Sequence, residues 1–158
     1  MRTPAELISL FRSKGLKVTP QRELVFRLLH ANTSHPTAEA VYSAALDVMP
    51  TMSLKTVYQV LNDLKALGEL KTIDVSKGAT RFDPNTGDHH HLVCDRCGIV
   101  HDIDIDSSEL ALGRSQRLGF VVSNIEITFR GLCGDCSAGR TAKSTVRSTH
   151  TTPTKETR

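Results

Sequence analysis

Four cysteines in two identical pairs constrain this sequence more than any other feature. Cys94 and Cys97 form one Cys-x-x-Cys pair, Cys133 and Cys136 form the second, and 35 residues separate the pairs. Four thiolates arranged as a tetrahedron are the ligand set of a closed structural zinc site. A redox dithiol is the alternative, and a single pair beside a βαβ pattern would favour it. The duplication of the pair favours zinc.

A second group of metal-binding residue types lies just upstream of the first cysteine pair. A histidine run from His89 to His91 stands between Asp83 and Asp102. Residues two apart on an extended segment point the same way, so His89 and His91 can face one ion. Nitrogen and carboxylate ligands without sulfur suit Fe(II), Mn(II) or Zn(II) rather than Cu(I). The alternative is a solvated polar loop that only resembles a site.

Charge is divided unevenly along the chain, although the total is only +3. Residues 1–83 carry 11 basic and 8 acidic side chains, whereas residues 84–136 carry 4 and 8. A basic first half suits phosphate, and an acidic, histidine-rich middle suits metal. No apolar run approaches the ~18 residues of a membrane span, and no hydrophobic block precedes a cleavage site, so we expect a cytoplasmic protein.

The first half of the chain has the pattern of four helices followed by a hairpin. A threonine precedes a proline at Thr3 and at Thr19, which is the arrangement of a capping hydroxyl before the first helical residue. The predicted helices run over 4–13, over 20–31, from Thr37 to Pro50 and from Ser53 to Gly68. Strands at 70–75 and 79–83, joined by a Ser-Lys-Gly turn, complete a predicted winged helix over residues 1–83.

The second half of the chain is predicted to be a smaller domain rich in strands. Residues 84–88 have the composition of a hinge, and residues 89–137 follow as the second domain. The predicted elements are strands at 91–94, 99–103 and 120–130 and a helix near 108–118. Residues 138–158 are rich in Ser, Thr, Lys and Arg, so we expect a disordered basic tail.

The fourth predicted helix is the expected DNA reader, because a helix capped after a short turn reproduces helix-turn-helix order. Ser53 stands at its cap, and its exposed residues are expected to be Lys55, Thr56, Tyr58, Gln59 and Asn62. These include phosphate partners and a glutamine suited to adenine. A polar helix face that is merely solvated is the alternative.

Several short motifs occur in a fixed order along the chain. They are Val18-Thr-Pro-Gln-Arg22, His35-Pro-Thr37, Ser53-Leu-Lys-Thr-Val-Tyr58, Arg81-Phe-Asp83, Asp88-His-His-His91 leading to Cys94-Asp-Arg-Cys97-Gly98, and Cys133-Gly-Asp-Cys136. As an ordered set they resemble the ferric uptake regulator family of bacterial metal-dependent repressors, over roughly residues 5–137.

The resemblance implies an α+β fold, with an N-terminal winged helix and a C-terminal α/β dimerisation domain. It implies structural zinc at the four cysteines, and it adds Arg22 to the expected DNA-binding residues. It also gives a role to the distant His35, which alone predicts nothing. The implied regulatory Fe or Mn ligands are His35, Asp83, His89, His91 and Asp102. Metal would close a homodimer onto a pseudo-palindromic operator.

Aspartates at both 83 and 102 resemble the peroxide-responsive branch of that family, since iron-regulated members more often carry glutamate. In that branch Fe(II) reacts with hydrogen peroxide, and a ligand histidine matching His35 or His89 is oxidised. An iron-responsive regulator, or another divalent-metal sensor, is the alternative on the same scaffold. A further metal site of some iron-sensing members is not expected, because Ile125 replaces one of its histidines. We do not expect an enzyme, because five protein ligands leave little of the metal's coordination sphere open, whereas catalytic metal sites keep a position free for substrate.

Overall fold

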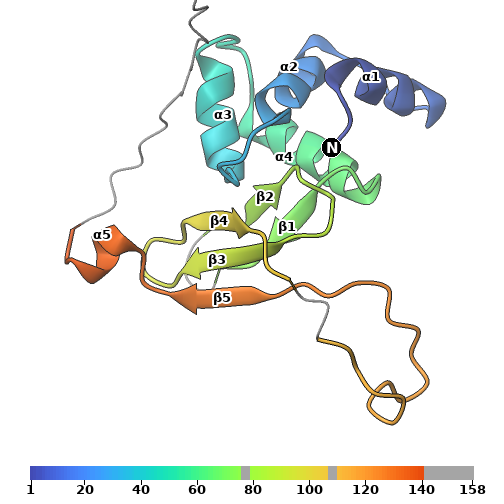
Figure 1. Ribbon diagram of the computed structural model, residues 1–158. Helices are drawn as coiled ribbons and strands as arrows, with labels where there is room; N and C mark the ends of the chain where they lie inside the picture. The colour runs from blue at the N-terminus through green and yellow to red at the C-terminus, as the bar shows by residue number, and fades with distance from the viewer. Residues whose placement is uncertain (76–78, 107–109, 141–158) are drawn as a thin grey trace, which may run out of the picture.

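The computed structural model describes residues 1–75, 79–106 and 110–140. Four helices come first in the chain, a two-stranded sheet follows, and a three-stranded sheet with a short helix comes last. Figure 1 shows the helices grouped on one side, the three-stranded sheet on the other, and β1 and β2 between them. Within the described residues, every helix is too short or too polar to span a lipid bilayer.

The helices begin where the sequence predicts. Their bounds are α1 Pro4–Ser13, α2 Pro20–Leu29, α3 Ala38–Leu46 and α4 Leu54–Ala66. Each cap residue accepts a hydrogen bond from a backbone N–H in the first turn, and these caps are Thr3, Thr19, Thr37 and Ser53. Such a bond satisfies a donor that has no partner within the helix. The apolar faces of all four helices meet in one core, where Phe11 and Phe26 pack edge to face at 4.8 Å between ring centroids.

The hairpin of the winged helix consists of β1 (Lys71–Ile73) and β2 (Arg81–Asp83), which pair antiparallel. The predicted turn at 76–78 lies outside the described residues. Two hydrogen bonds tie β2 to the loop before α3: Phe82 N–H donates to the Pro36 carbonyl at 2.9 Å, and Arg81 Nη1 donates to the His35 carbonyl at 3.4 Å. The side chain of Phe82 is buried in the helical core, so β2 is fixed to the helices.

The second sheet has the strand order β4-β3-β5. Its strands are β3 (His90–Cys94), β4 (Val100–Ile103) and β5 (Thr128–Gly131), followed by α5 (Gly134–Ser137). β3 pairs antiparallel with β4 and parallel with β5. Val93 and Val100 pack with Ile73 of β1 in a small apolar cluster, so the winged helix contacts this sheet through its hairpin.

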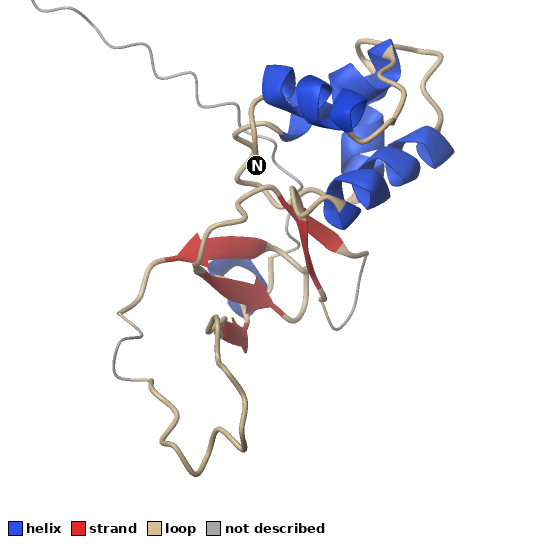
Figure 2. Cartoon of the chain, turned by 90° about the vertical axis from the view of Figure 1, so that its right-hand side faces the viewer, coloured by secondary structure: helices blue, strands red, loops and turns tan. Residues whose placement is uncertain are grey.

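The helix predicted near 108–118 and most of the strand predicted at 120–130 are absent from the described residues. Residues 110–118 form no helix, residues 114–119 form turns, and β5 begins only at Thr128. Leu118, Phe120 and Val121 are 82%, 74% and 94% exposed. In one chain this apolar segment has no surface to pack against, and short helices depend on such packing for stability. Figure 2 shows the segment as a long loop that extends away from the sheet.

Candidate metal centres

The four cysteine sulfurs converge at the end of the second sheet. Cys94 ends β3, Cys97 lies in the turn after it, and Cys133 and Cys136 lie at the start and within α5. One ligand atom from each lies within 4.8 Å of the others, and the Cys97 and Cys133 sulfurs are 3.7 Å apart. Sulfurs bound to one zinc at about 2.3 Å in a tetrahedron lie about 3.8 Å from one another. The spacing is therefore that of a Cys₄ metal site.

Local hydrogen bonds prepare one of the thiols for a cation. Burial acts to raise the pKa of Cys94, but backbone N–H groups of Cys133, Cys97 and Arg96 lower it to about 6. Burial and the neighbouring thiols raise the pKa of Cys136 to about 12, and burial also raises that of Cys97. Four adjacent thiolates repel one another, and a bound Zn²⁺ offsets this repulsion.

The second group brings together the five residues expected to bind the regulatory metal. Ligand atoms of His35, Asp83, His89 and His91 lie within 4.8 Å of one another. Asp102 completes the group, because its Oδ1 lies 2.7, 3.4 and 3.7 Å from Nε2 of His35, His89 and His91. Ligands on one ion at about 2.1 Å lie roughly 3.0–4.2 Å apart in an octahedron. The Asp102 distances to His89 and His91 fall in this range, and the shorter His35–Asp102 contact would widen slightly around a single ion.

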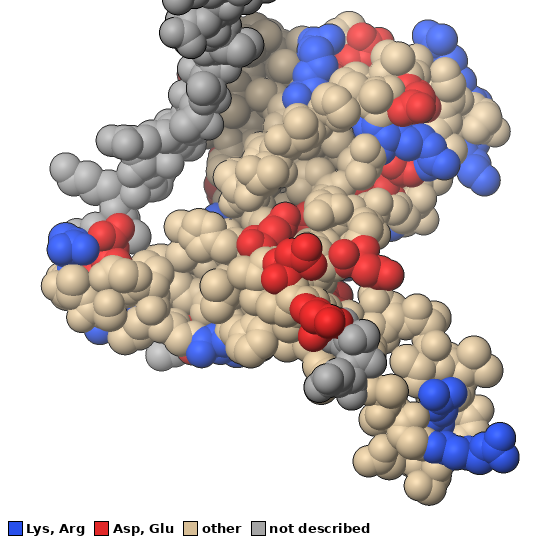
Figure 3. All heavy atoms as spheres, in the orientation of Figure 1, with Lys and Arg blue, Asp and Glu red and all other residues tan. Residues whose placement is uncertain are grey.

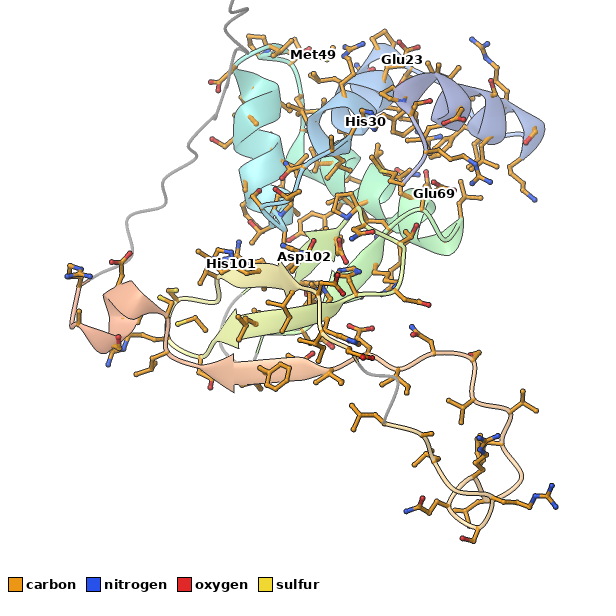
Figure 4. All side chains as sticks on the ribbon, in the orientation of Figure 1. Glu23, His30, Met49, Glu69, His101 and Asp102 are labelled. Carbon is orange, nitrogen blue, oxygen red and sulfur yellow. The ribbon has the colours of Figure 1, made fainter. Side chains whose placement is uncertain are left out.

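Separate parts of the fold supply these five candidate ligands. His35 precedes Pro36 in the loop before α3 and has a left-handed backbone with φ 47°. Asp83 ends β2, His89 immediately precedes β3, and His91 lies in β3, where it pairs with Asp102 of β4. Figure 4 shows Asp102 on β4, on the side of the sheet that faces the helices. The group thus lies between the winged helix and the second sheet.

The histidine nitrogens at the centre of this group are buried and lack well-aligned hydrogen bonds. His35, Asp83 and His91 are each 1% exposed. Nε2 of His35, His89 and His91, and Oδ2 of Asp83, make no such bond within the described residues, although the carboxylates lie close. Burial, and then the nearby His89, lower the pKa of His91, which favours the neutral imidazole that a metal binds. These side chains are therefore buried rather than solvated, in contrast to the alternative of a solvated polar loop.

The residues expected to contact DNA fall into two groups. Ser53, Lys55, Tyr58 and Gln59 are exposed on α4, and Thr56 is half-buried with its hydroxyl 2.8 Å from that of Ser53. Figure 3 shows Lys and Arg side chains over the helices, and acidic side chains gathered in the middle of the same face.

Arg22, in contrast, makes its contacts within the helical core. Its Nη2 donates to Asp63 at 2.6 Å, its Nη1 donates to the Lys17 carbonyl at 2.7 Å, and its guanidinium lies over the Phe11 ring. A motif alone does not reveal such an intramolecular partner.

Sequence reasoning missed two acidic residues beside the expected sites. Tyr58 donates its hydroxyl proton to Glu39 of α3 at 2.8 Å, and Glu126 Oε1 lies 3.5 Å from His91 Nδ1. Both contacts form between segments that are distant in the sequence. The position of Glu126 follows only from the parallel β3–β5 register, for which the sequence carries no signal.

Comparison with known proteins assigns the family. The model of the ferric uptake regulator family matches residues 13–130 of the chain. The chain belongs to this family. The peroxide-responsive repressor PerR of Staphylococcus epidermidis is 32% identical over 132 residues, which cover 83% of this chain and 88% of the relative. The family assignment confirms the expected class, a metal-responsive transcriptional regulator rather than an enzyme.

Solved structures of the ferric uptake regulator family confirm the α+β fold. The Helicobacter pylori ferric uptake regulator Fur, described as having three functional metal-binding sites, matches with a TM-score of 0.71 and 21% identity, over 84% of this chain and 90% of that one. The Campylobacter jejuni peroxide stress regulator matches with a TM-score of 0.62 and 26% identity, over 86% of this chain and all of that one. Regulators of this family bind DNA as dimers.

Proposed function

We propose that this chain is a homodimeric repressor that senses hydrogen peroxide through Fe(II) bound by His35, Asp83, His89, His91 and Asp102. The observation that carries the proposal is the convergence of two carboxylates and three buried imidazole Nε2 atoms that lack well-aligned hydrogen bonds, between the winged helix and the second sheet. Two aspartates in this set, and 32% identity to a peroxide-responsive repressor, support peroxide as the signal.

A metal bound by this group links the two halves of the chain. His35 and Asp83 belong to the helical half, whereas His89, His91 and Asp102 belong to the second sheet or the loop leading to it. β2 ends at Asp83 and β3 begins at His90, which supports domain limits of 1–83 and 89–137 with a hinge at 84–88. A ligand that bridges only the closed arrangement shifts the population toward it. Metal binding thereby fixes the position of α4 relative to the dimerisation domain.

Bound Fe(II) supplies the chemistry that makes the site sensitive to peroxide, and overall hydrogen peroxide transfers one oxygen atom to an imidazole and leaves as water. The Asp102 side chain is 31% exposed, so a small solute can approach the site beside it. An oxidised His35 or His89 binds metal less well, because the ring gains a polar substituent where the ligands are packed. The closed arrangement is then lost and the DNA is released. Mn(II) does not reduce peroxide in this way and should maintain repression.

In this proposal the four cysteines hold structural Zn²⁺. A pseudo-palindromic operator is read by the residues at the start of α4, namely Ser53, Lys55, Thr56, Tyr58 and Gln59. Arg22 supports DNA binding by holding the helices in place through its contacts with Asp63 and Lys17. Exposed Lys55 suits phosphate, and Gln59 suits the edge of adenine. We place the protein in the cytoplasm, where thiols stay reduced and available to zinc. Residues 138–158 are assigned as a basic tail.

The test uses an operator selected from random duplex DNA with the Mn(II)-loaded protein. Brief hydrogen peroxide should release the operator from the Fe(II)-loaded protein and add one oxygen to the peptide containing His35 or His89, as mass spectrometry can measure. The Mn(II)-loaded protein is the matched control and should keep both its DNA and its mass. An Fe(II) complex that remains unchanged with no added oxygen refutes peroxide sensing and favours an iron-responsive regulator.

A further inference from the structure

The outer nitrogens of the three ligand histidines have different surroundings. All three present Nε2 to the aspartates, which leaves Nδ1 on the far edge of each ring. Nδ1 of His89 lies 2.9 Å from the Gly87 carbonyl oxygen. Nδ1 of His35 is buried and has no hydrogen-bond partner among the described residues. Nδ1 of His91 is also buried, and a carboxylate oxygen of Glu126 lies 3.5 Å from it.

Metal-binding histidines almost always donate their second ring N–H to a carboxylate, a carbonyl or water, and this bond fixes the tautomer and the orientation of the ring. His89 has such a partner in Gly87. For His91, whose side chain is 1% exposed, the Glu126 carboxylate is the nearby acceptor. Glu126 lies at the Nδ1 edge and the aspartates lie at the Nε2 edge, so Glu126 does not compete for the metal position.

The backbone fixes the position of Glu126 closely. The next residue, Ile127, accepts a hydrogen bond from His91 N–H at 3.0 Å and donates its own N–H to His90 Nδ1 at 3.2 Å. Both polar groups of Ile127 are therefore bonded to β3. Glu126 is the last residue but one before β5, and it begins at a fixed distance from the ligand strand although its side chain is 45% exposed.

We propose that Glu126 is a positioning residue for the ligand His91: its carboxylate accepts the Nδ1–H of the imidazole and leaves Nε2 unprotonated and aimed at the metal. This inference rests on the proposed metal site and adds a residue outside its five ligands. The negative charge also makes the imidazole a stronger donor to a cation. Because Glu126 ends the apolar loop at 110–125, the bond connects the metal ligand to that loop.

The experiment measures Mn(II) affinity by electron paramagnetic resonance of the free ion, in protein that retains its zinc. Glu126→Ala should weaken Mn(II) binding about 10–100-fold, as is typical when an outer partner of a ligand histidine is lost. Glu126→Gln keeps an acceptor oxygen but loses the charge, so its affinity should fall between those of Glu126→Ala and the unmodified protein. Asp47→Asn removes one exposed carboxylate that caps the C-terminal end of α3, the end opposite the loop carrying His35, and should leave Mn(II) affinity unchanged.

A second measurement separates positioning from a general effect on folding. In Zn(II)-loaded protein, the Nδ1 proton of His91 should be shifted downfield and slow to exchange, and Glu126→Ala should remove both properties without changing the zinc content of the cysteine site. If His89→Ala lowers Mn(II) affinity but Glu126→Ala does not, the positioning role is overturned and the metal site stands. If neither variant changes the affinity, the proposed metal site itself is wrong.

Discussion

Replacing Cys136 by serine should unfold the second sheet while the helical half stays folded. Cys136 is 1% exposed and shares its site with the other three thiols. The described apolar core around this sheet is small, with Ile73, Val93 and Val100 buried and Val75 packed against them. The helices have a much larger core of their own. The folded state of the second sheet therefore depends on two contributions, the metal site and the small apolar cluster.

The magnitudes decide which contribution dominates. Three buried aliphatic side chains at about 1.5–3 kcal/mol each stabilise by roughly 5–9 kcal/mol before any cost in conformational entropy. Structural zinc in small domains binds with an apparent free energy of about 10–16 kcal/mol near neutral pH, and that binding free energy is also folding free energy. Loss of one of four thiolates should therefore cost more than the apolar core can replace.

The assay combines amide-proton NMR, which reports folding of each segment, with elemental mass spectrometry, which measures the bound zinc. Cys136→Ser should lose zinc, and resonances of β3, β4 and β5 should collapse to unfolded positions while those of α1–α4 remain dispersed. Val100→Ala is the control, because it should cost only roughly 2 kcal/mol in burial and cavity and should keep its zinc. A Cys136→Ser protein with dispersed sheet resonances and no zinc would refute the reasoning.

Three further predictions concern the other parts of the molecule. His35→Ala should lower Mn(II) affinity by more than the ~10–100-fold expected for loss of an outer partner, measured by competition with a chelating dye, and unchanged affinity would exclude His35 as a ligand. Val121→Asp places a charge on a side chain that is 94% exposed in one chain, and it should weaken the dimer about tenfold or more in sedimentation equilibrium, with metal content unchanged. The Tyr58 hydroxyl lowers the pKa of Glu39 from its ordinary value of 4.5, so the stabilisation it brings is present above about pH 4.5 and is lost as pH falls through the lowered value. The free energy of unfolding, measured in urea, should thus fall more between pH 6 and pH 3 for the unmodified protein than for Tyr58→Phe. An equal fall in both proteins would contradict a stabilising Tyr58–Glu39 hydrogen bond.

Features set by local chemistry could be predicted from the sequence, and features set by distant pairing could not. Thr19 caps α2 because a hydroxyl one residue before a proline is a local signal, and the predicted bounds at that end are confirmed. The prediction of a helix near 108–118 is wrong for the described residues, because an amphipathic pattern indicates only that an apolar face needs a partner. The spacing of His89 and His91 placed both on one face, but Glu126 came from a segment whose register no local pattern encodes.

The hydrogen bond from Phe82 to Pro36 joins the segments that carry His35 and Asp83, so these two side chains move as one body. In the proposed metal site they would therefore act as a bidentate chelator built on the winged helix. Once one donor binds an ion, the other is already at high effective concentration beside it. Docking therefore incurs the entropic cost of one encounter, and intermediate states with a single donor attached should be rare. The closure of the two halves should accordingly follow metal concentration as a single step.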